Sequence, residues 1–177
     1  MENLQNKPID WKITETGFFE VKSFVYPSGD SYVEYTSHLR IAGFPFVHMT
    51  FGRSPETGRR KVAKGFISLG RIAVGVIPVG QLAAGVFPIG QAAFGIVFAL
   101  GQAAFGWTAL GQLAIAWSLA VGQLAVAQNA IGQLAVGGYC IGQAAVGEHI
   151  YTPKKKDPET LKHFQELLPI VKKLTAG

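Results

Sequence analysis

The chain has 177 residues, a formal net charge of +5 at pH 7 and one cysteine. Its length allows one domain, or one domain with an appendage, and a single cysteine excludes an internal disulfide. Residues 1–25 contain no charged head followed by an apolar run, so we expect no secretory signal peptide. We expect the protein to be cytoplasmic, with a location at or in the inner face of the membrane as the alternative. Its basic residues lack interleaved exposed aromatics, which disfavours nucleic acid as a partner.

The N-terminal part, residues 1–64, predicts a small β-rich cap. Residues 18–26 and 31–36 alternate between apolar and polar types, and a Pro-Ser-Gly-Asp sequence between them favours a hairpin turn. Residues 40–51 supply one or two further strands. Such a cap would cover the open edge of the repeat that follows, because a bare strand edge promotes aggregation.

A glycine-rich repeat at residues 65–151 dominates the chain. Glycine, or alanine at positions 116 and 127, recurs about every five residues, and a Gly-Gln pair recurs about every ten. A step of five residues turns an α-helix by about 500°, so equivalent residues would share no face. Pro78 and Pro88 would each cost a helix about 3 kcal/mol. A corner every five residues, with short strands between corners, instead predicts an all-β fold, a β-solenoid.

The number of residues in one coil follows from two stretched steps, Gly95 to Gly101 and Ala116 to Gly122, which lie 21 residues apart. Coils of 20 or 21 residues would place both insertions on the same corner of neighbouring coils. A ten-residue coil would enclose almost no core. We therefore predict about four coils, right- or left-handed, over residues 70–89, 90–110, 111–131 and 132–151.

The glutamines of the repeat then form two structural ladders on opposite sides of the solenoid. One contains Gln81, Gln102, Gln123 and Gln143, and the other contains Gln91, Gln112 and Gln133. Stacked amides can hydrogen-bond along the axis, as they do in cross-β assemblies. A polar groove for a ligand is the alternative interpretation of the same residues.

The phrase Ile89-Gly-Gln-Ala-Ala-Phe resembles the motif of left-handed hexapeptide-repeat proteins, and the five-residue spacing resembles the pentapeptide-repeat proteins. The resemblance covers about half of the chain. It implies a short-period β-solenoid fold and no particular activity. The catalytic histidine of the hexapeptide acyltransferases has no counterpart here, because the repeat contains no histidine before His149.

No Asp, Glu, Lys, Arg or His occurs from Ile72 to Gly147, so even the outward positions of the solenoid are apolar. We expect this surface to be covered by other copies of the chain or by lipid. The candidate contact residues for assembly are Phe87, Phe98, Trp107 and Trp117. The candidate contacts to a membrane surface or phosphate are the flanking cations Arg59, Arg60, Lys61, Lys64, Lys154, Lys155 and Lys156.

Residues 152–177 predict a basic linker and a C-terminal helix. Asp157 is a favourable N-cap and Pro158 suits the first helical position. An apolar stripe follows at Leu161, Phe164, Leu167, Leu168 and Val171, and Pro169 should bend or end the helix. The helix is expected to pack on the last coil or, alternatively, to lie on an anionic membrane.

No nucleophile–base pair, carboxylate pair or phosphate loop is evident, and His38, His48 and His149 lack metal-ligand spacing. We therefore expect a protein that is not an enzyme and has no cofactor or metal. The first hypothesis is a structural scaffold that assembles with itself into a homo-oligomer or filament. The second is a membrane-embedded or membrane-bound solenoid that acts as a scaffold or pore. A third is a channel or small-molecule carrier built from several copies.

Overall fold

A computed structural model describes residues 9–168 of the chain. By its contacts the chain divides into two compact units, Met1–Ala92 and Ala93–Gly177, and the boundary in the sequence falls within strand β8 (Ile89–Gly95). Most of the described residues are in strands, and α1 (Pro158–Leu167) is the helix of the second unit. The expectations for Pro169 and Val171 lie outside the described residues.

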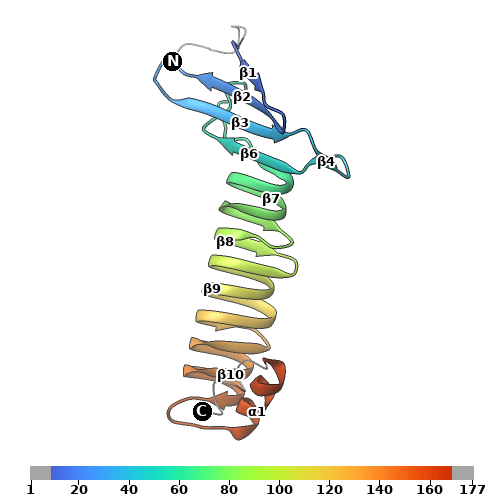
Figure 1. Ribbon diagram of the computed structural model, residues 1–177. Coiled ribbons are helices and arrows are strands. Elements are labelled where there is room, and N and C mark those ends of the chain that lie inside the picture. Colours follow the sequence, from blue (N-terminus) through green and yellow to red (C-terminus); the bar gives the residue numbers. More distant parts are fainter. Residues whose placement is uncertain (1–8, 169–177) are drawn as a thin grey trace. The chain divides into compact units, whose positions relative to one another are not determined.

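The first unit begins with an antiparallel sheet (Figure 1). Its strands lie in the order β1 (Lys12–Glu15), β2 (Phe19–Val25), β3 (Ser31–Ser37) and β6 (Val47–Phe51). The turn between β2 and β3 has Gly29 at a φ of 86°, and the Tyr26 amide donates to the Asp30 carbonyl at 2.8 Å. A second, short hairpin pairs β4 (Arg40–Ile41) with β5 (Phe44–Pro45) around Gly43 at a φ of 83°. The predicted hairpin is confirmed.

Strand β6 joins this sheet to the repeat. It pairs in parallel with the beginning of β7 (Ala63–Gly85), and Val47 lies opposite Ile67. The Ile67 amide also donates to the Phe46 carbonyl at 2.8 Å. The sheet therefore supplies the layer on which the first coil of the repeat stacks.

The repeat forms a β-solenoid, as predicted, but each coil contains about ten residues. In the second unit β9 (Phe98–Val126) pairs in parallel with β10 (Asn129–Tyr151), and Gly132 lies opposite Gly122. In the first unit, a side chain added at Gly85 would collide with the carbonyl oxygen of Gly75 on the preceding coil. The expectation of four coils of 20 or 21 residues is therefore wrong, because the coils are shorter and more numerous.

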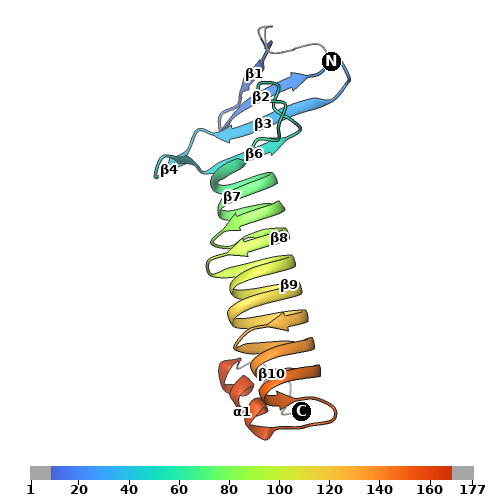
Figure 2. The same cartoon turned by 180° about the vertical axis from the view of Figure 1, so that it is seen from behind.

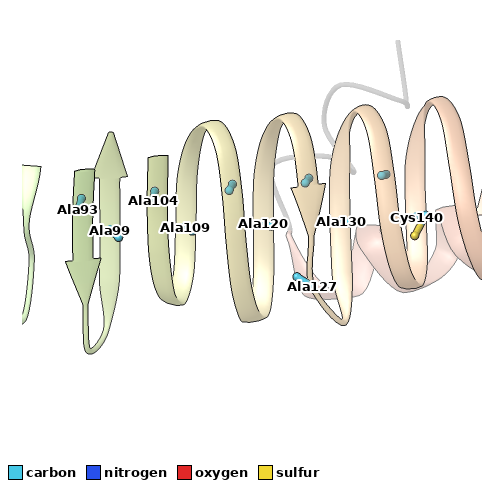
Figure 3. Packing of buried hydrophobic residues seen from close by; sticks show 11 residues of the cluster. Ala93, Ala99, Ala104, Ala109, Ala120, Ala127, Ala130 and Cys140 are labelled. Atoms are coloured by element: carbon cyan, nitrogen blue, oxygen red, sulfur yellow. The ribbon is translucent and has the colours of Figure 1, made fainter. Parts of the chain in front are cut away.

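The interior of the solenoid holds only one small side chain every five or six residues. In the first unit these buried positions are Ala63, Ser68, Ala73, Pro78, Ala83 and Pro88. In the second unit they are Ala93, Ala99, Ala104, Ala109, Ala114, Ala120, Ala125, Ala130, Ala135 and Cys140 (Figure 3). The predicted coil length is too long because a coil of this solenoid needs no large core. Two alanine methyl groups fill a ten-residue coil, since its opposite walls lie very close together.

Two coils of the second unit contain eleven residues. A Cβ at Gly106 would lie 2.6 Å from the carbonyl oxygen of Gly95, eleven residues earlier. A Cβ at Gly122 would likewise meet the carbonyl oxygen of Gly111, again eleven residues earlier. Both extra residues fall at corresponding corners, between Ala93 and Ala99 and between Ala114 and Ala120. The insertions thus occupy the same corner of the solenoid, as predicted. They lie two coils apart, because each coil has ten or eleven residues rather than 20 or 21.

Helix α1 follows the last coil and lies alongside β10 (Figure 2). It begins as predicted, because the Asp157 side chain accepts a hydrogen bond from the Glu159 amide at 3.0 Å and Pro158 occupies the first turn. Thr160 and Phe164 are buried. The helix therefore packs on the solenoid, which was the first of the two arrangements expected for it.

Candidate functional site

The large apolar side chains of the repeat point outward, because the interior accepts only small ones. We call the exposed members of this set the apolar wall. In the first unit they are Val74, Leu82, Phe87 and Ile89, and in the second they are Phe94, Ile96, Val97, Trp107, Leu110, Ile115, Trp117, Leu134 and Val146. Soluble monomers rarely expose contiguous apolar surface on this scale, and such surface marks an interaction site.

The wall occupies both faces of the solenoid in the second unit. Ala109 and Ala114 lie half a coil apart and so point inward from opposite walls. Next to them in sequence are Leu110 and Ile115, and both are exposed on the outside. Exposed apolar side chains thus follow these inward alanines on both faces of the solenoid. A partner that covered one face alone would leave the other exposed to water.

The four residues proposed for assembly differ in exposure. Phe87 is 44% exposed, Trp107 56% and Trp117 76%, whereas Phe98 is half-buried. Trp107 follows the glycine of its corner and Trp117 accompanies the second insertion. On the same surface, the rings of Phe94 and Phe105 stack at 5.0 Å with an interplanar angle of 8°. At this pair, large apolar side chains of successive coils are therefore in contact on the outside of the solenoid.

The glutamines of the repeat lie at one position of the ten-residue coil, and we call those of each unit the glutamine column. The first unit contributes Gln81 and Gln91, and the second contributes Gln102, Gln112, Gln123, Gln133 and Gln143. Their spacing of ten or eleven residues equals one coil, so the expectation of two ladders on opposite sides is wrong. All seven are exposed, and within residues 9–168 none of their side chains makes a hydrogen bond.

The predicted basic residues are exposed on both flanks of the charge-free segment. Arg59, Arg60, Lys61 and Lys64 precede it, and Lys154, Lys155 and Lys156 follow it. Lys61 also binds Glu34, with its Nζ atom 2.7 Å from the carboxylate. The remaining cations are exposed to solvent and can contact anions. Within residues 9–168, their arrangement does not form a defined anion-binding site.

A buried carboxylate network in the first unit was missed by the sequence analysis. Glu34 is 6% exposed and accepts hydrogen bonds from the Tyr32 hydroxyl at 2.8 Å and from His48 Nε2 at 2.9 Å. The His48 Nδ1 atom accepts from the Lys64 amide at 2.8 Å, which leaves Nε2 as the donor. Burial raises the pKa of Glu34, but the hydrogen bonds from His48, Lys61 and Tyr32 outweigh it and lower the pKa to about 2.

This network ties the antiparallel sheet to the entry of the solenoid. Glu34 lies on β3, His48 lies on β6, and Lys61 and Lys64 lie on the segment that enters β7. Thr50 of β6 adds a hydrogen bond to the Lys61 carbonyl at 3.0 Å. Alternation in residues 31–36 could have indicated that Glu34 shares the face of Tyr32, but its partners come from distant segments. The arrangement neutralises a buried charge and fixes the first coil in place.

A second cluster joins α1 to the last coils of the second unit. The Tyr139 ring lies against His149 at 4.7 Å and against His163 at 3.8 Å, nearly parallel to both. His149 Nδ1 is 3.0 Å from the Asp157 carboxylate and 3.6 Å from that of Glu159. His149, Asp157 and Glu159 offer ligand atoms within 4.8 Å of one another, the type of set that can hold a metal ion. The sequence alone did not predict this cluster, because the turn after Tyr151 brings its residues together only in the fold.

No helix within residues 9–168 has both the length and the apolar composition needed to cross a bilayer. A search of protein-family models, of curated proteins and of solved structures found no match to this chain.

Proposed function

We propose that the protein is a non-enzymatic scaffold embedded in a membrane, with the apolar wall facing lipid. The observation that carries this proposal is the presence of large apolar side chains on both faces of a solenoid whose interior takes only small residues. Lipid can cover both faces and the Trp-bearing edge at once. No Asp, Glu, Lys, Arg or His lies between Ile72 and Gly147 to oppose insertion.

The backbone of a solenoid meets the main requirement for residence in lipid, which is that its polar groups are paired within the protein. Successive coils of the second unit bond to each other, as in the Thr108 amide to the Val97 carbonyl at 3.0 Å and the Tyr139 amide to the Gln128 carbonyl at 2.9 Å. After the last coil the chain folds back, and the Asp157 amide donates to the Ile150 carbonyl at 3.2 Å. Open strand edges are therefore confined to the ends of a stack.

The dimensions and flanking charges agree with such a location. The charge-free coils of the second unit, Ala93 to Gly147, stack to about 25 Å at a strand spacing of about 4.8 Å, close to the roughly 30 Å of a hydrocarbon core. Lysines 154–156 follow this segment and are exposed. Cations beside an apolar segment interact favourably with anionic headgroups.

Assembly with other copies in aqueous solution, as a homo-oligomer or filament, is the second candidate. One observation favours it: Trp107 and Trp117 lie well inside the charge-free segment rather than near its ends. Tryptophan in membrane proteins prefers the headgroup level, whereas at protein interfaces it serves as a buried anchor. In this alternative neighbouring copies would cover the wall on both faces. A pore or carrier would require several copies in either setting.

Fractionation separates the two candidates. We expect the full chain expressed in bacterial cells to stay in the membrane pellet after alkaline carbonate extraction and to require detergent for its release. Leu110→Lys places a charge within the wall and should reduce the carbonate-resistant fraction several-fold, since a central lysine disfavours insertion by about 3 kcal/mol. Glu148→Lys, just outside the charge-free segment, is the matched control. Recovery of the unmodified chain as large assemblies without detergent would favour assembly in solution.

A further inference from the structure

The glutamine column of the second unit is a strip of polar groups on an otherwise apolar surface. Its five members, Gln102, Gln112, Gln123, Gln133 and Gln143, are exposed, and none hydrogen-bonds through its side chain to any residue in the described part of the chain. Each side-chain amide offers two donors and one acceptor. Stacking of the coils therefore repeats an unpaired amide at every level of the solenoid.

A need for partners at this column rests on the proposed membrane location of the protein. In water these amides would bond to solvent, and the strip would need no further partner. In hydrocarbon no solvent is present, and an unpaired amide is strongly unfavourable. Polar side chains within membranes accordingly bond to polar groups of neighbouring segments. A partner that supplies donors and acceptors at the same spacing would satisfy all of these amides together.

A second copy of this chain supplies that spacing. The column repeats every ten or eleven residues, so two copies inserted in the same direction place like coils at the same level. An amide is complementary to another amide, because each contains both a donor and an acceptor. A glycine precedes each glutamine, at positions 101, 111, 122, 132 and 142, and the place of a Cβ at the last four is taken by a carbonyl oxygen of the preceding coil, so successive glutamines stack one coil apart. The segment contains no Asp, Glu, Lys, Arg or His that would cause charge repulsion between the copies.

We propose that the glutamine column is the contact between two parallel copies of the protein in the membrane. The amides bond across the pair, and the apolar wall of each copy remains toward lipid. The contact differs from the one that the sequence suggested, since it uses the polar edge and leaves Trp107 and Trp117 outside. Bonding of the amides along their own column, or to a small polar ligand, would leave the copies separate.

Cysteine crosslinking in membranes tests the contact. Cys140→Ala removes the single cysteine, and alanine suits this inward position because the other buried residues of the core cluster in these coils are alanines. Into that background Gln123→Cys is introduced on the column, and Trp117→Cys at the opposite corner serves as the matched control. With copper phenanthroline as oxidant we expect at least tenfold more covalent dimer from Gln123→Cys. Equal yields, or more dimer from Trp117→Cys, would overturn the proposal.

A second variant removes the polar groups. The triple variant combines Gln112→Leu, Gln123→Leu and Gln133→Leu. We expect it to sediment in detergent as a monomer, whereas the unmodified chain sediments as a dimer. The variant should remain resistant to carbonate extraction. A triple variant that remains dimeric contradicts the proposal. If carbonate resistance holds and Gln123→Cys gives no dimer, the pairing is wrong and the membrane location stands. If carbonate releases the unmodified chain, both fail, because the amides then bond to water.

Discussion

Tyr139 on β10 stacks on His163 of α1 with their ring centroids 3.8 Å apart and their planes 11° apart. His163 Nε2 in turn lies 2.7 Å from the Asn129 side-chain oxygen at the beginning of β10. One histidine thus holds the helix to the solenoid through both a ring face and a polar edge. The buried Phe164 beside it completes the contact.

Loss of this contact should loosen the helix. We expect His163→Ala to lower the stability of the helix docking by about 1 kcal/mol or more, since it removes a stacked pair and a hydrogen bond. Cleavage by trypsin at the exposed lysines 154–156 should then accelerate several-fold. His38→Ala, in the antiparallel-sheet unit, is the control. Unchanged cleavage in His163→Ala would show that Phe164 alone secures the helix.

The inward alanines should not tolerate larger side chains. Ala109→Leu would force an isobutyl group between two closely spaced walls, and overpacking of this kind costs typically 1–3 kcal/mol or more. Ala144→Leu makes the same chemical change at an exposed position of the repeat and should be neutral. Thermal unfolding of the two variants under one set of conditions provides the measurement. Similar midpoints would mean that the interior can expand.

Glycine at the corners is required by the approach of the coil below. Gly132→Ala would place its Cβ against the carbonyl oxygen of Gly122, and the backbone would have to shift. Gly17→Ala meets no atom within 4 Å and is the matched control. We expect the first variant to unfold at a lower denaturant concentration and the second to match the unmodified chain. Equal unfolding midpoints would contradict the close stacking.

The Glu34 network predicts a pH-dependent contribution to stability. The pKa of Glu34 is lowered in the folded state to about 2, from its ordinary value of 4.5, because His48, Lys61 and Tyr32 donate hydrogen bonds to the carboxylate. Its contribution is therefore present above the unfolded pKa and is lost as the pH falls through the folded pKa. Because Lys61 is half exposed, we expect Glu34→Gln to lower the free energy of unfolding by only about 2 kcal/mol at pH 7.

The same difference should shrink as the pH falls from about 4.5 toward 2, where the carboxyl of the unmodified chain is itself protonated. Denaturant unfolding at pH 7, 4.5 and 2.5, followed by tryptophan fluorescence, measures it. Glu15→Gln, at an exposed position of β1, is the control and should change little at any pH. A Glu34→Gln effect that does not vary with pH would indicate that side-chain packing, rather than the charge, dominates.

The sequence by itself determined that residues 65–151 form a β-solenoid, since glycine every five residues, Pro78 and Pro88 are incompatible with a helix. It also determined the hairpin before the repeat and the start of α1 at Asp157, because turn and capping preferences are local. The absence of charge between Ile72 and Gly147 was enough to predict apolar side chains on the outside of the solenoid, and these side chains are exposed. These conclusions depend only on neighbouring residues and composition.

Only the tertiary structure decided the coil length, and with it the placement of every outward side chain. A period of five is compatible with coils of ten or twenty residues, and the choice depends on how closely the walls approach. Gly122 lies opposite Gly132, so one coil contains ten residues. Gln123 and Gln133 therefore belong to one column. The contacts of Glu34 and Tyr139 could not be predicted either, because their partners come from segments that only folding brings together.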